Sequence, residues 1–334
     1  MNTPRTITVH SFCSATGGAG KSVLAIASAK ILAAGGRFPA LLDCDFTGTS
    51  IADGLRLCAP RVVLAGDGSL DLDANPTEEV LSHDKTSSLR DARGRASWDD
   101  KPPPPPYLND ALTYQSTDPA RECRLDAMVW RHERTDNVRY FPSSPLRKDV
   151  SIALGWIFGD TPLEWLRRMV WLLDEMATRF DDLTDVILDL PPGLWGFAHE
   201  ASVLVSRIER QLPWPEGYPS WENSAVQWRA NPILVVPPDR NGLYVSLEYL
   251  AKNASNVPGL LPIVNRNHEG LSAVRDAVRS RFGGVRAGLG LEEKLRSVDE
   301  MRSTLGRVFL DQDLPLTDEV KAMAKTLRLT GLQQ

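Results

Sequence analysis

The sequence predicts an α/β fold, with a doubly wound, mostly parallel sheet of about seven strands covered by helices. Three observations predict it. Short β-rich runs alternate with helical stretches along the chain. Several of these runs are almost continuously apolar, such as Val186–Leu188 and Ile233–Val236, which is typical of strands covered on both faces. A glycine-rich turn joins the first such run to the first helical stretch.

The individual elements follow from local patterns. Apolar positions Leu24, Ala27 and Ile31 recur at helical spacing after Lys21 until Gly35 and Gly36 end the helix. A second apolar stripe runs through Leu163–Phe180, and we expect that helix to cover the sheet. The expected strands are Ile7–Cys13, Ala40–Phe46, Val138–Phe141, Asp185–Leu190, Pro232–Val236, Leu260–Asn265 and Arg307–Leu310.

Composition and charge are those of an ordinary globular protein. The 334 residues are 42% hydrophobic and 24% charged, with a net charge of −5, so the whole molecule has no basic surface for nucleic acid. The four cysteines form no CxxC pair, which argues against structural zinc or an iron–sulfur cluster. The N-terminal residues lack a charged-then-apolar leader and no apolar run reaches membrane-spanning length, so we expect a cytoplasmic protein.

We expect one domain over residues 1–334 with two insertions. Residues 57–137 break the pattern and include the proline run Pro102–Pro106, so we expect this insertion to be partly disordered. The prolines could act as a stiff spacer or as an extended ligand for an aromatic groove. A smaller insertion, residues 211–229, is rich in tryptophan and proline and could form a lid or pack locally against the domain.

The strongest motif is a glycine-rich turn between a strand and a helix, which is the context of a phosphate-binding loop. The motif residues are Gly17, Gly18, Ala19, Gly20, Lys21, Ser22 and Val23. Glycines let backbone N–H groups approach phosphate oxygens, and the helix N-terminus adds positive potential. Lys21 would supply a full charge at the β- and γ-phosphates, and Ser22 would offer its hydroxyl to Mg²⁺.

Three aspartates are expected at the same edge of the sheet. Asp43 and Asp45 end an apolar strand, and Asp189 ends the buried run Val186–Leu188. Because the carboxyl ends of parallel strands meet at one edge, these acids should lie beside the phosphates, where they could organise magnesium and water. Asp189 alone could also be a turn residue or helix cap.

Together, Gly17–Ser22, Asp43-x-Asp45 and Asp189-Leu-Pro-Pro-Gly193 resemble the ParA/MinD family of deviant Walker A P-loop ATPases, of the SIMIBI class. The resemblance covers Thr6–Leu55 and about Asn137 to the C-terminal region. It implies that Asp45 positions or activates the attacking water, that Asp43 supports the magnesium shell, and that Asp189 contacts Mg²⁺ through water.

The resemblance also assigns two further positions. It implies that Gly193 begins a segment that senses the γ-phosphate. It implies as well that Asn265 reads adenine through its amide, although an Asn at a strand end is also a common turn former.

The sequence departs from the family at one position. Thr16 stands where the family has a signature lysine that reaches the phosphates of a partner subunit. A cation supplied in trans can change the rate of phosphoryl transfer by about 10³ to 10⁵, so ATP binding is better supported than hydrolysis. Arg207, Arg210 or an arginine of the insertions could replace the missing charge.

The expected function is an ATP-binding switch that forms a homodimer with ATP, hydrolyses it slowly and controls the positioning or assembly of a protein partner. The alternative is a nucleotide-binding scaffold with little hydrolysis. Arg275, Arg279, Arg281 and Arg286 could contact nonspecific DNA or could be a solvated helix face. We expect no membrane targeting, because the C-terminal stretch Lys321–Gln334 is short and ends in polar residues.

Overall fold

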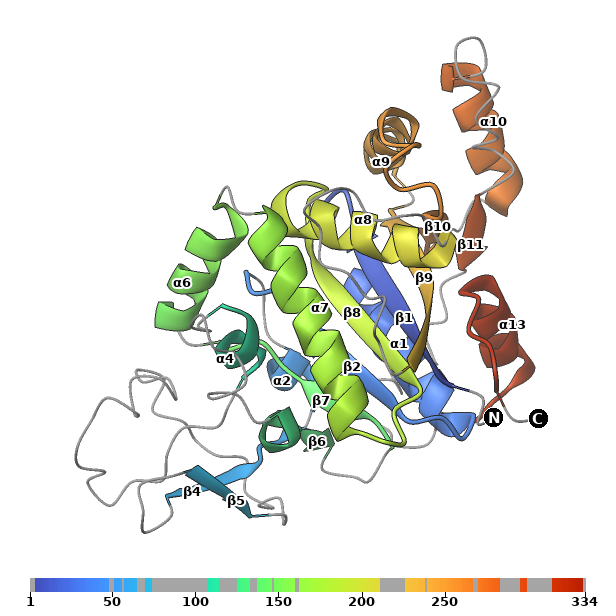
Figure 1. The fold of residues 1–334 in the computed structure, drawn as a ribbon. Helices are drawn as coiled ribbons and strands as arrows, with labels where there is room; N and C mark the ends of the chain where they lie inside the picture. Colours follow the sequence, from blue (N-terminus) through green and yellow to red (C-terminus); the bar gives the residue numbers. More distant parts are fainter. Residues whose placement is uncertain are drawn as a thin grey trace.

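A seven-stranded sheet forms the centre of the molecule, with strand order β11-β10-β9-β1-β8-β2-β7. The computed structural model describes residues 4–47, 51–55, 57–64, 70–73, 107–113, 125–132, 137–145, 147–159, 162–210, 226–237, 239–266, 270–282, 295–298 and 314–332. Helices cover both faces of the sheet (Figure 1). All strand pairs in this sheet are parallel, which confirms the predicted fold class.

The seven strands are β1 (Arg5–Ser14), β2 (Pro39–Asp43), β7 (Arg139–Phe141), β8 (Asp185–Pro192), β9 (Val226–Val236), β10 (Leu261–Asn265) and β11 (Arg296–Val298). Six of them overlap the runs expected from the sequence. The seventh is β11, a strand of three residues beside β10, and the expected strand Arg307–Leu310 lies outside the described residues. β11 was not predicted, because its three residues are too few to show an apolar pattern.

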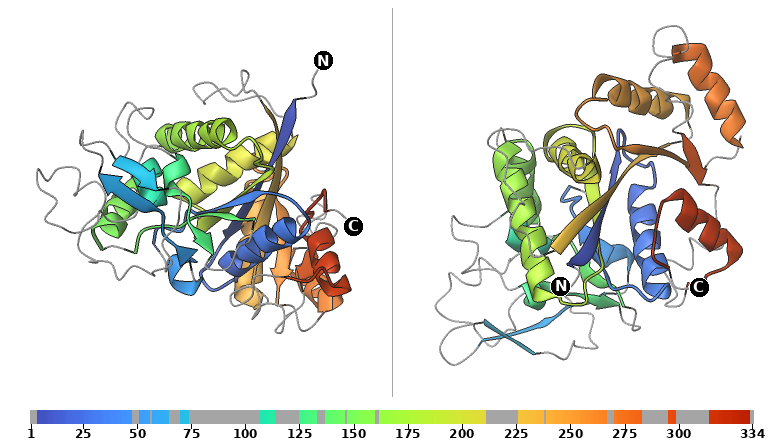
Figure 2. Two further views of the ribbon diagram at one scale, coloured as in Figure 1. Left: turned by 90° about the horizontal axis from the view of Figure 1, so that it is seen from below. Right: turned by 45° about the vertical axis from the view of Figure 1, so that its right-hand side comes forward.

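Two helix layers bury the two faces of the sheet. On one face lie α1 (Lys21–Ala34) and α13 (Asp318–Thr326), whose buried side chains share a core with alternate residues of the strands. On the other lie α7 (Pro162–Arg179), α8 (Gly196–Arg210) and α9 (Arg240–Lys252) (Figure 2). The expected stripe on α7 is confirmed, because Leu166, Met169, Val170, Leu173 and Met176 are all buried in this second core.

The structure describes five further helices. They are α2 (Ile51–Gly54), α4 (Leu108–Leu112), α6 (Arg147–Ile157), α10 (Gly270–Phe282) and the 3₁₀ helix η1 (Leu125–Met128). In α10, Arg279 pairs with Asp276 at 3.4 Å on an exposed surface. The described part of the C-terminal region packs against the sheet through Val320, Met323 and Ala324 of α13.

Residues 57–137 contribute described structure in several places. β3 (Leu57–Cys58) pairs antiparallel with β6 (Arg131–His132), and β4 (Arg61–Leu64) pairs antiparallel with β5 (Leu70–Asp73). The apolar side chains of α4 and η1 belong to the same core as α7. The proline run Pro102–Pro106 lies outside the described residues.

The tryptophan- and proline-rich stretch ends in regular structure. β9 begins at Val226, so Trp228 stands in a strand, where it packs against the core from a partly buried position. Trp214 and Trp221 lie outside the described residues. Among the helices that the structure describes, none is both long and apolar enough to cross a membrane.

Candidate functional site

The glycine-rich turn connects the end of β1 to the start of α1. Gly18 and Gly20 both have left-handed backbone conformations, with φ of 75° and 84°. Gly20 occupies the N-cap position of α1, and no side chain in the described chain caps this end of the helix. The first N–H groups of α1 therefore have no partner within the helix and lie beside a turn with two left-handed glycines. This is the geometry of an anion-binding site.

The sheet register brings the acids to this turn. Asp43 of β2 stands directly opposite Asp189 of β8, and Asp189 stands opposite Phe12 near the end of β1. Gly193 follows β8, and its N–H donates to the carbonyl of Ser14 at 2.9 Å. The ends of β1, β2 and β8 are thus held together, as the parallel sheet predicted.

Lys21 forms the centre of the site. Its ammonium donates to Asp189 Oδ1 at 2.7 Å and lies 3.4 Å from Asp45 Oδ2, while Lys21 and Asp189 are only 6% and 1% exposed. Burial alone would lower the pKa of Lys21, but the charges of Asp189 and Asp45 outweigh it and leave the pKa above its ordinary value. Lys21 is therefore a buried, positively charged ammonium.

Asp189 carries the opposite charge in the same buried place. Burial raises its pKa, and Lys21 together with a hydrogen bond from Ser22 opposes that increase. Removing two charges from water is costly unless each keeps a partner. Lys21 and Asp189 therefore stabilise one another as a buried ion pair.

Asp43 has a different environment. It accepts hydrogen bonds from Ser143 Oγ at 2.7 Å and from the N–H of Ile51 at 3.0 Å, and it is fully surrounded by protein. Burial, reinforced by the negative charge of Asp189, raises its pKa to about 7. Through these hydrogen bonds Asp43 holds the start of α2 and the chain after β7 next to β2.

Asp45 lies at the more open side of the site. One carboxylate oxygen accepts a hydrogen bond from Thr47 Oγ1 at 2.9 Å, and the other faces Lys21. Its side chain is 16% exposed, more than Asp43 or Asp189. Of the three acids, Asp45 is the one that solvent can reach.

Asn265 and Arg266 close the other side of the turn. Asn265 donates to the carbonyl of Ala19 at 2.9 Å and accepts from the N–H of Arg266, so its amide ties β10 to the glycine-rich turn. The amide thus uses one of its two N–H groups and one of its two oxygen lone pairs within the protein. A Cβ placed on Gly20 would lie 3.7 Å from Arg266 Nη2, so the guanidinium reaches the turn. Arg266 itself has a left-handed φ of 54°.

An exposed aromatic pair lies beside Gly193. Trp195 stacks on Phe158, with ring centroids 4.7 Å apart and planes 23° apart, although the two side chains are 50% and 58% exposed. Gly193 has a φ of 95°, and a Cβ there would lie 2.3 Å from Trp195 Nε1. The tryptophan is therefore packed directly against the backbone of the segment that follows Asp189.

The donor set fits magnesium held together with phosphate. Among the described residues, no three His, Cys, Asp or Glu side chains are grouped so that they alone could hold a metal ion. Mg²⁺ usually binds through one or two carboxylates, phosphate oxygens and waters. Asp189 and the Ser22 hydroxyl, beside an uncapped helix N-terminus, are the side chains that would contribute oxygen atoms to such a shell.

The structure thus brings most of the predicted site residues together around one turn. Arg207 and Arg210 are not among them, because both lie in the last turn of α8, at the end far from Gly196. Ser143 and Arg266 were missed. Neither belongs to a local motif, and only the folded chain brings Ser143 to Asp43 and Arg266 to Gly20.

Comparisons with known proteins agree on the fold. No protein-family model matches the sequence, and no curated protein matches it. Among solved structures, the chain is similar to an ATP complex of McdA from Cyanothece, with a TM-score of 0.52, 12% identity and coverage of 99% of this chain and 100% of that one.

Two further solved structures are similar over nearly their whole length. The cell division ATPase MinD from Pyrococcus furiosus has a TM-score of 0.51 and 16% identity, with 98% of each chain covered. A ParA family ATPase from Chlorobium tepidum has a TM-score of 0.50 and 13% identity, with 96% of this chain and 99% of that chain covered. At these identities the likeness concerns architecture, and the chain has the fold of the MinD and ParA ATPases.

Proposed function

We propose that this chain is a ParA/MinD-like ATPase that binds ATP with Mg²⁺ and acts as a dimerising switch controlling the positioning or assembly of a partner. One observation carries the proposal. A buried lysine is held between two aspartates, at 2.7 and 3.4 Å, directly beside an uncapped helix N-terminus. Burying a group of charges costs desolvation energy even when they are paired, and such a cluster suits a site that exchanges carboxylate for phosphate.

Each residue of the site has a defined task in this proposal. The N–H groups of Gly18–Val23 hold phosphate oxygens, and Lys21 turns its ammonium from Asp189 toward the β- and γ-phosphates. Asp189 and Ser22 would hold Mg²⁺ through their side-chain oxygen atoms. Asp43 supports them by fixing β2, α2 and the chain after β7 in place.

Asp45 is proposed to orient the attacking water. It is the acid with solvent access, and Thr47 holds one of its oxygens in position. Bound Mg-ATP supplies the phosphoryl group and the electrophilic phosphorus. Asn265 is proposed to read the base, and Arg266 to add a cation beside the loop in the absence of the family's signature lysine at Thr16.

The partner-binding part of the proposal is supported by Trp195 and Phe158. A stacked but exposed aromatic pair is typical of an interaction site, and here it packs against the backbone of Gly193. A change in the segment after Asp189 would move this surface. The second subunit or the cargo could then respond to bound ATP.

Light scattering tests the switch. The molar mass of the purified protein is measured with ATP, with ADP and without nucleotide, for wild type and for Asp45→Ala, which should retain ATP. We expect a dimer with ATP in both proteins, longer-lived in Asp45→Ala, and a monomer otherwise. The matched control is Asp182→Ala, a half-exposed residue just before the start of β8, the end of that strand opposite Asp189. An unchanged mass under all conditions would contradict the switch.

A second candidate is a nucleotide-binding scaffold with little hydrolysis, and Thr16 is the observation that favours it. Phosphate release separates the two functions. The switch predicts a basal rate well below about 100 s⁻¹ that Lys21→Ala abolishes. A wild-type rate equal to that of Lys21→Ala would favour the scaffold.

A further inference from the structure

A polar pocket lies beside the first half of β9 and near the start of β1. Lys21 follows the other end of β1. The volume of the pocket is about 400 Å³, within the range of small-molecule sites. Thr8 of β1 lines it, six residues before Ser14, which corresponds to about 20 Å along a strand. The pocket is therefore separate from the glycine-rich turn.

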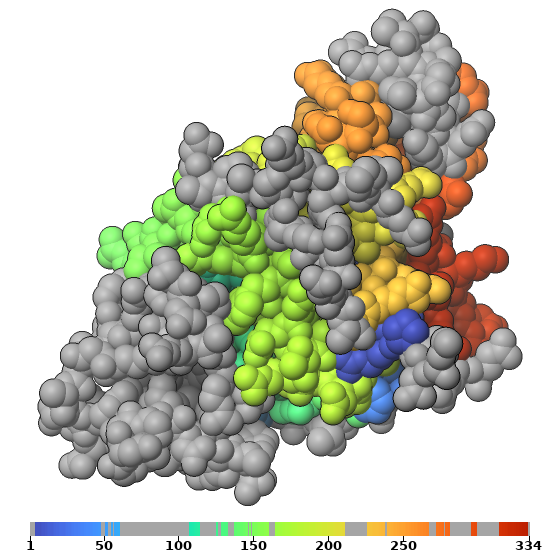
Figure 3. Space-filling model, in the orientation of Figure 1, coloured from blue at the N-terminus to red at the C-terminus, as the bar shows by residue number. Residues whose placement is uncertain are grey.

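The pocket forms because the strands have unequal lengths. β10 begins at Leu261, opposite Ile233, so β9 from Val226 to Asn231 extends beyond its neighbour on that side. The last turn of α8 and the chain after α13 line the space that results. At the surface, the beginnings of β1 (blue) and β9 (gold) lie side by side next to α13 (red) (Figure 3).

Asn231 presents a buried acceptor in this pocket. It is only 5% exposed, and its Oδ1 has no hydrogen-bond donor within the described chain. Its Nδ2 contacts His10 Nδ1 at 3.1 Å and donates to the carbonyl of Leu327 at 2.7 Å. A buried acceptor without a donor destabilises the folded protein, and a donor from a ligand would offset that cost.

The orientation of that amide is fixed by a buried network. His10 Nε2 lies 3.1 Å from Asp185 Oδ1, and because a carboxylate only accepts hydrogen bonds, Nε2 carries the proton. His10 Nδ1 is then an acceptor and requires the NH₂ of Asn231 on its side. The oxygen of Asn231 is consequently left without a donor among the described residues, in a side chain that lines the pocket.

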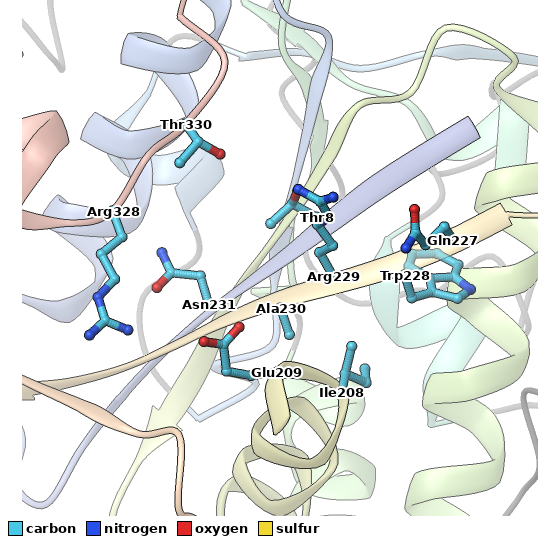
Figure 4. A pocket seen from close by; sticks show the side chains of 10 residues that line it. All are labelled: Thr8, Ile208, Glu209, Gln227, Trp228, Arg229, Ala230, Asn231, Arg328 and Thr330. Atoms are coloured by element: carbon cyan, nitrogen blue, oxygen red, sulfur yellow. The ribbon is translucent and has the colours of Figure 1, made fainter. Parts of the chain in front are cut away.

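Charged side chains of both signs surround this acceptor. Figure 4 shows Asn231 between Arg328 and Arg229, with Glu209 below it. Burial raises the pKa of Glu209, and the nearby Arg328 and Arg210 oppose that increase. Ile208 and Ala230 add an apolar wall. The pocket thus offers cations, an anion, a neutral acceptor and an apolar surface.

We propose that this pocket binds a small α-amino acid with an aliphatic side chain. Arg229 and Arg328 pair with its carboxylate, while Glu209 and Asn231 Oδ1 accept hydrogen bonds from its ammonium. The side chain rests on Ile208 and Ala230. A zwitterion matches the arrangement better than a simple anion, because an anion would leave Asn231 Oδ1 without a donor and would face Glu209.

Calorimetry with three probes that share an isobutyl side chain tests the ligand class. The probes are L-leucine, 4-methylpentanoate, which lacks the amino group, and isopentylamine, which lacks the carboxylate. We expect leucine to bind with a Kd below about 1 mM. Each analogue should bind at least about tenfold more weakly, because each loses one charged contact. No leucine binding, or equal binding of leucine and 4-methylpentanoate, would overturn the proposal.

Variants test the residues. Arg229→Gln, Glu209→Gln and Arg328→Asn should each weaken leucine binding by about tenfold or more. Asn is chosen at Arg328 because that residue has a φ of 54°, which Asn tolerates. Lys325→Gln, at an exposed position of α13, is the matched control and should change nothing, as should Lys21→Ala, whose site is separate. Unaltered leucine affinity in all three pocket variants would refute the assignment.

Discussion

At the scale of single residues, the proposed nucleotide site depends on where charges are buried. Lys21, Asp43, Asp45 and Asp189 could be predicted as candidate site residues from the sequence, because each belongs to a short motif at or just after a strand end. Their mutual arrangement could not. That the lysine pairs with Asp189 rather than pointing to solvent, and that Asp43 accepts from Ser143, follows from the strand register and from segments 100 residues apart in sequence.

Arg266 gives a prediction at this scale. Because its guanidinium reaches Gly20, Arg266→Asn should weaken ATP binding by about tenfold, the effect of one charge-assisted contact. Asn keeps the left-handed backbone, so the free energy of unfolding should stay within about 0.5 kcal/mol of wild type. Titration with Mg-ATP measures the affinity, and urea unfolding measures the free energy of unfolding. Arg240→Gln on α9 is the control, and equal affinity in both variants would remove Arg266 from the site.

Asp185 gives a prediction for pH dependence. Burial alone would raise its pKa, but hydrogen bonds from His10 and from Arg37 Nε, at 2.6 Å, hold the pKa below its ordinary value of 3.8. A depressed carboxylate pKa stabilises the folded state above the ordinary value, and this stabilisation is lost as pH falls through the folded-state pKa.

Asp185→Asn should therefore cost about 3 kcal/mol at pH 7, since it breaks a buried ion pair. The difference from wild type should shrink as pH falls below about 4. Urea unfolding at several pH values measures it. Asp276→Asn, in an exposed pair, should cost less than about 1 kcal/mol. A wild-type advantage that is the same at pH 7 and pH 3 would be inconsistent with this role of Asp185.

At the scale of elements, the glycine-rich turn makes a matched pair of predictions. Gly20→Ala places a methyl group 2.3 Å from Asn265 Nδ2 on a backbone with φ of 84°, whereas at Gly17 nothing lies within 4 Å of an added Cβ. Gly20→Ala should cost about 2 kcal/mol of unfolding free energy, and Gly17→Ala less than about 0.5 kcal/mol. Chemical unfolding without nucleotide compares them. Equal costs would show that the turn is not held by β10.

The segment after β8 gives the next prediction. Trp195→Ala removes half of the exposed aromatic pair while leaving Lys21 and Asp189 untouched. We expect its affinity for ATP to stay within about twofold of wild type while its ATP-dependent dimerisation or partner binding weakens by tenfold or more, as for an interface aromatic. Light scattering measures the dimerisation, and calorimetry measures the affinity for ATP. Loss of ATP affinity with intact dimerisation would reverse the assignment.

Element prediction from the sequence succeeded where patterns were long. The nearly continuous apolar runs of β8 and β9 and the stripe on α7 were sufficient. β11 was not found, because three residues carry too little pattern and pair only through β10. The partial burial of α4 and η1 within residues 57–137 was also invisible, since it depends on contacts with α7.

At the scale of the whole molecule, one sheet carries two sites at different ends. The carboxyl ends of β1, β2 and β8 hold Lys21 and the three aspartates, and the start of β9 holds the polar pocket. Between them, the network of His10, Asp185 and Asn231 spans the three central strands. The fold could be predicted from the sequence, whereas the pocket depends on the unequal lengths of β9 and β10.

The most direct test of the central claim is calorimetric titration of the nucleotide-free protein with ATP and Mg²⁺. We expect saturable binding at one site per chain, dependent on Mg²⁺ and lost in Lys21→Ala, while Lys252→Ala, at an exposed position of α9, binds as wild type does. No heat of binding for wild type, or the same affinity in Lys21→Ala, would contradict it.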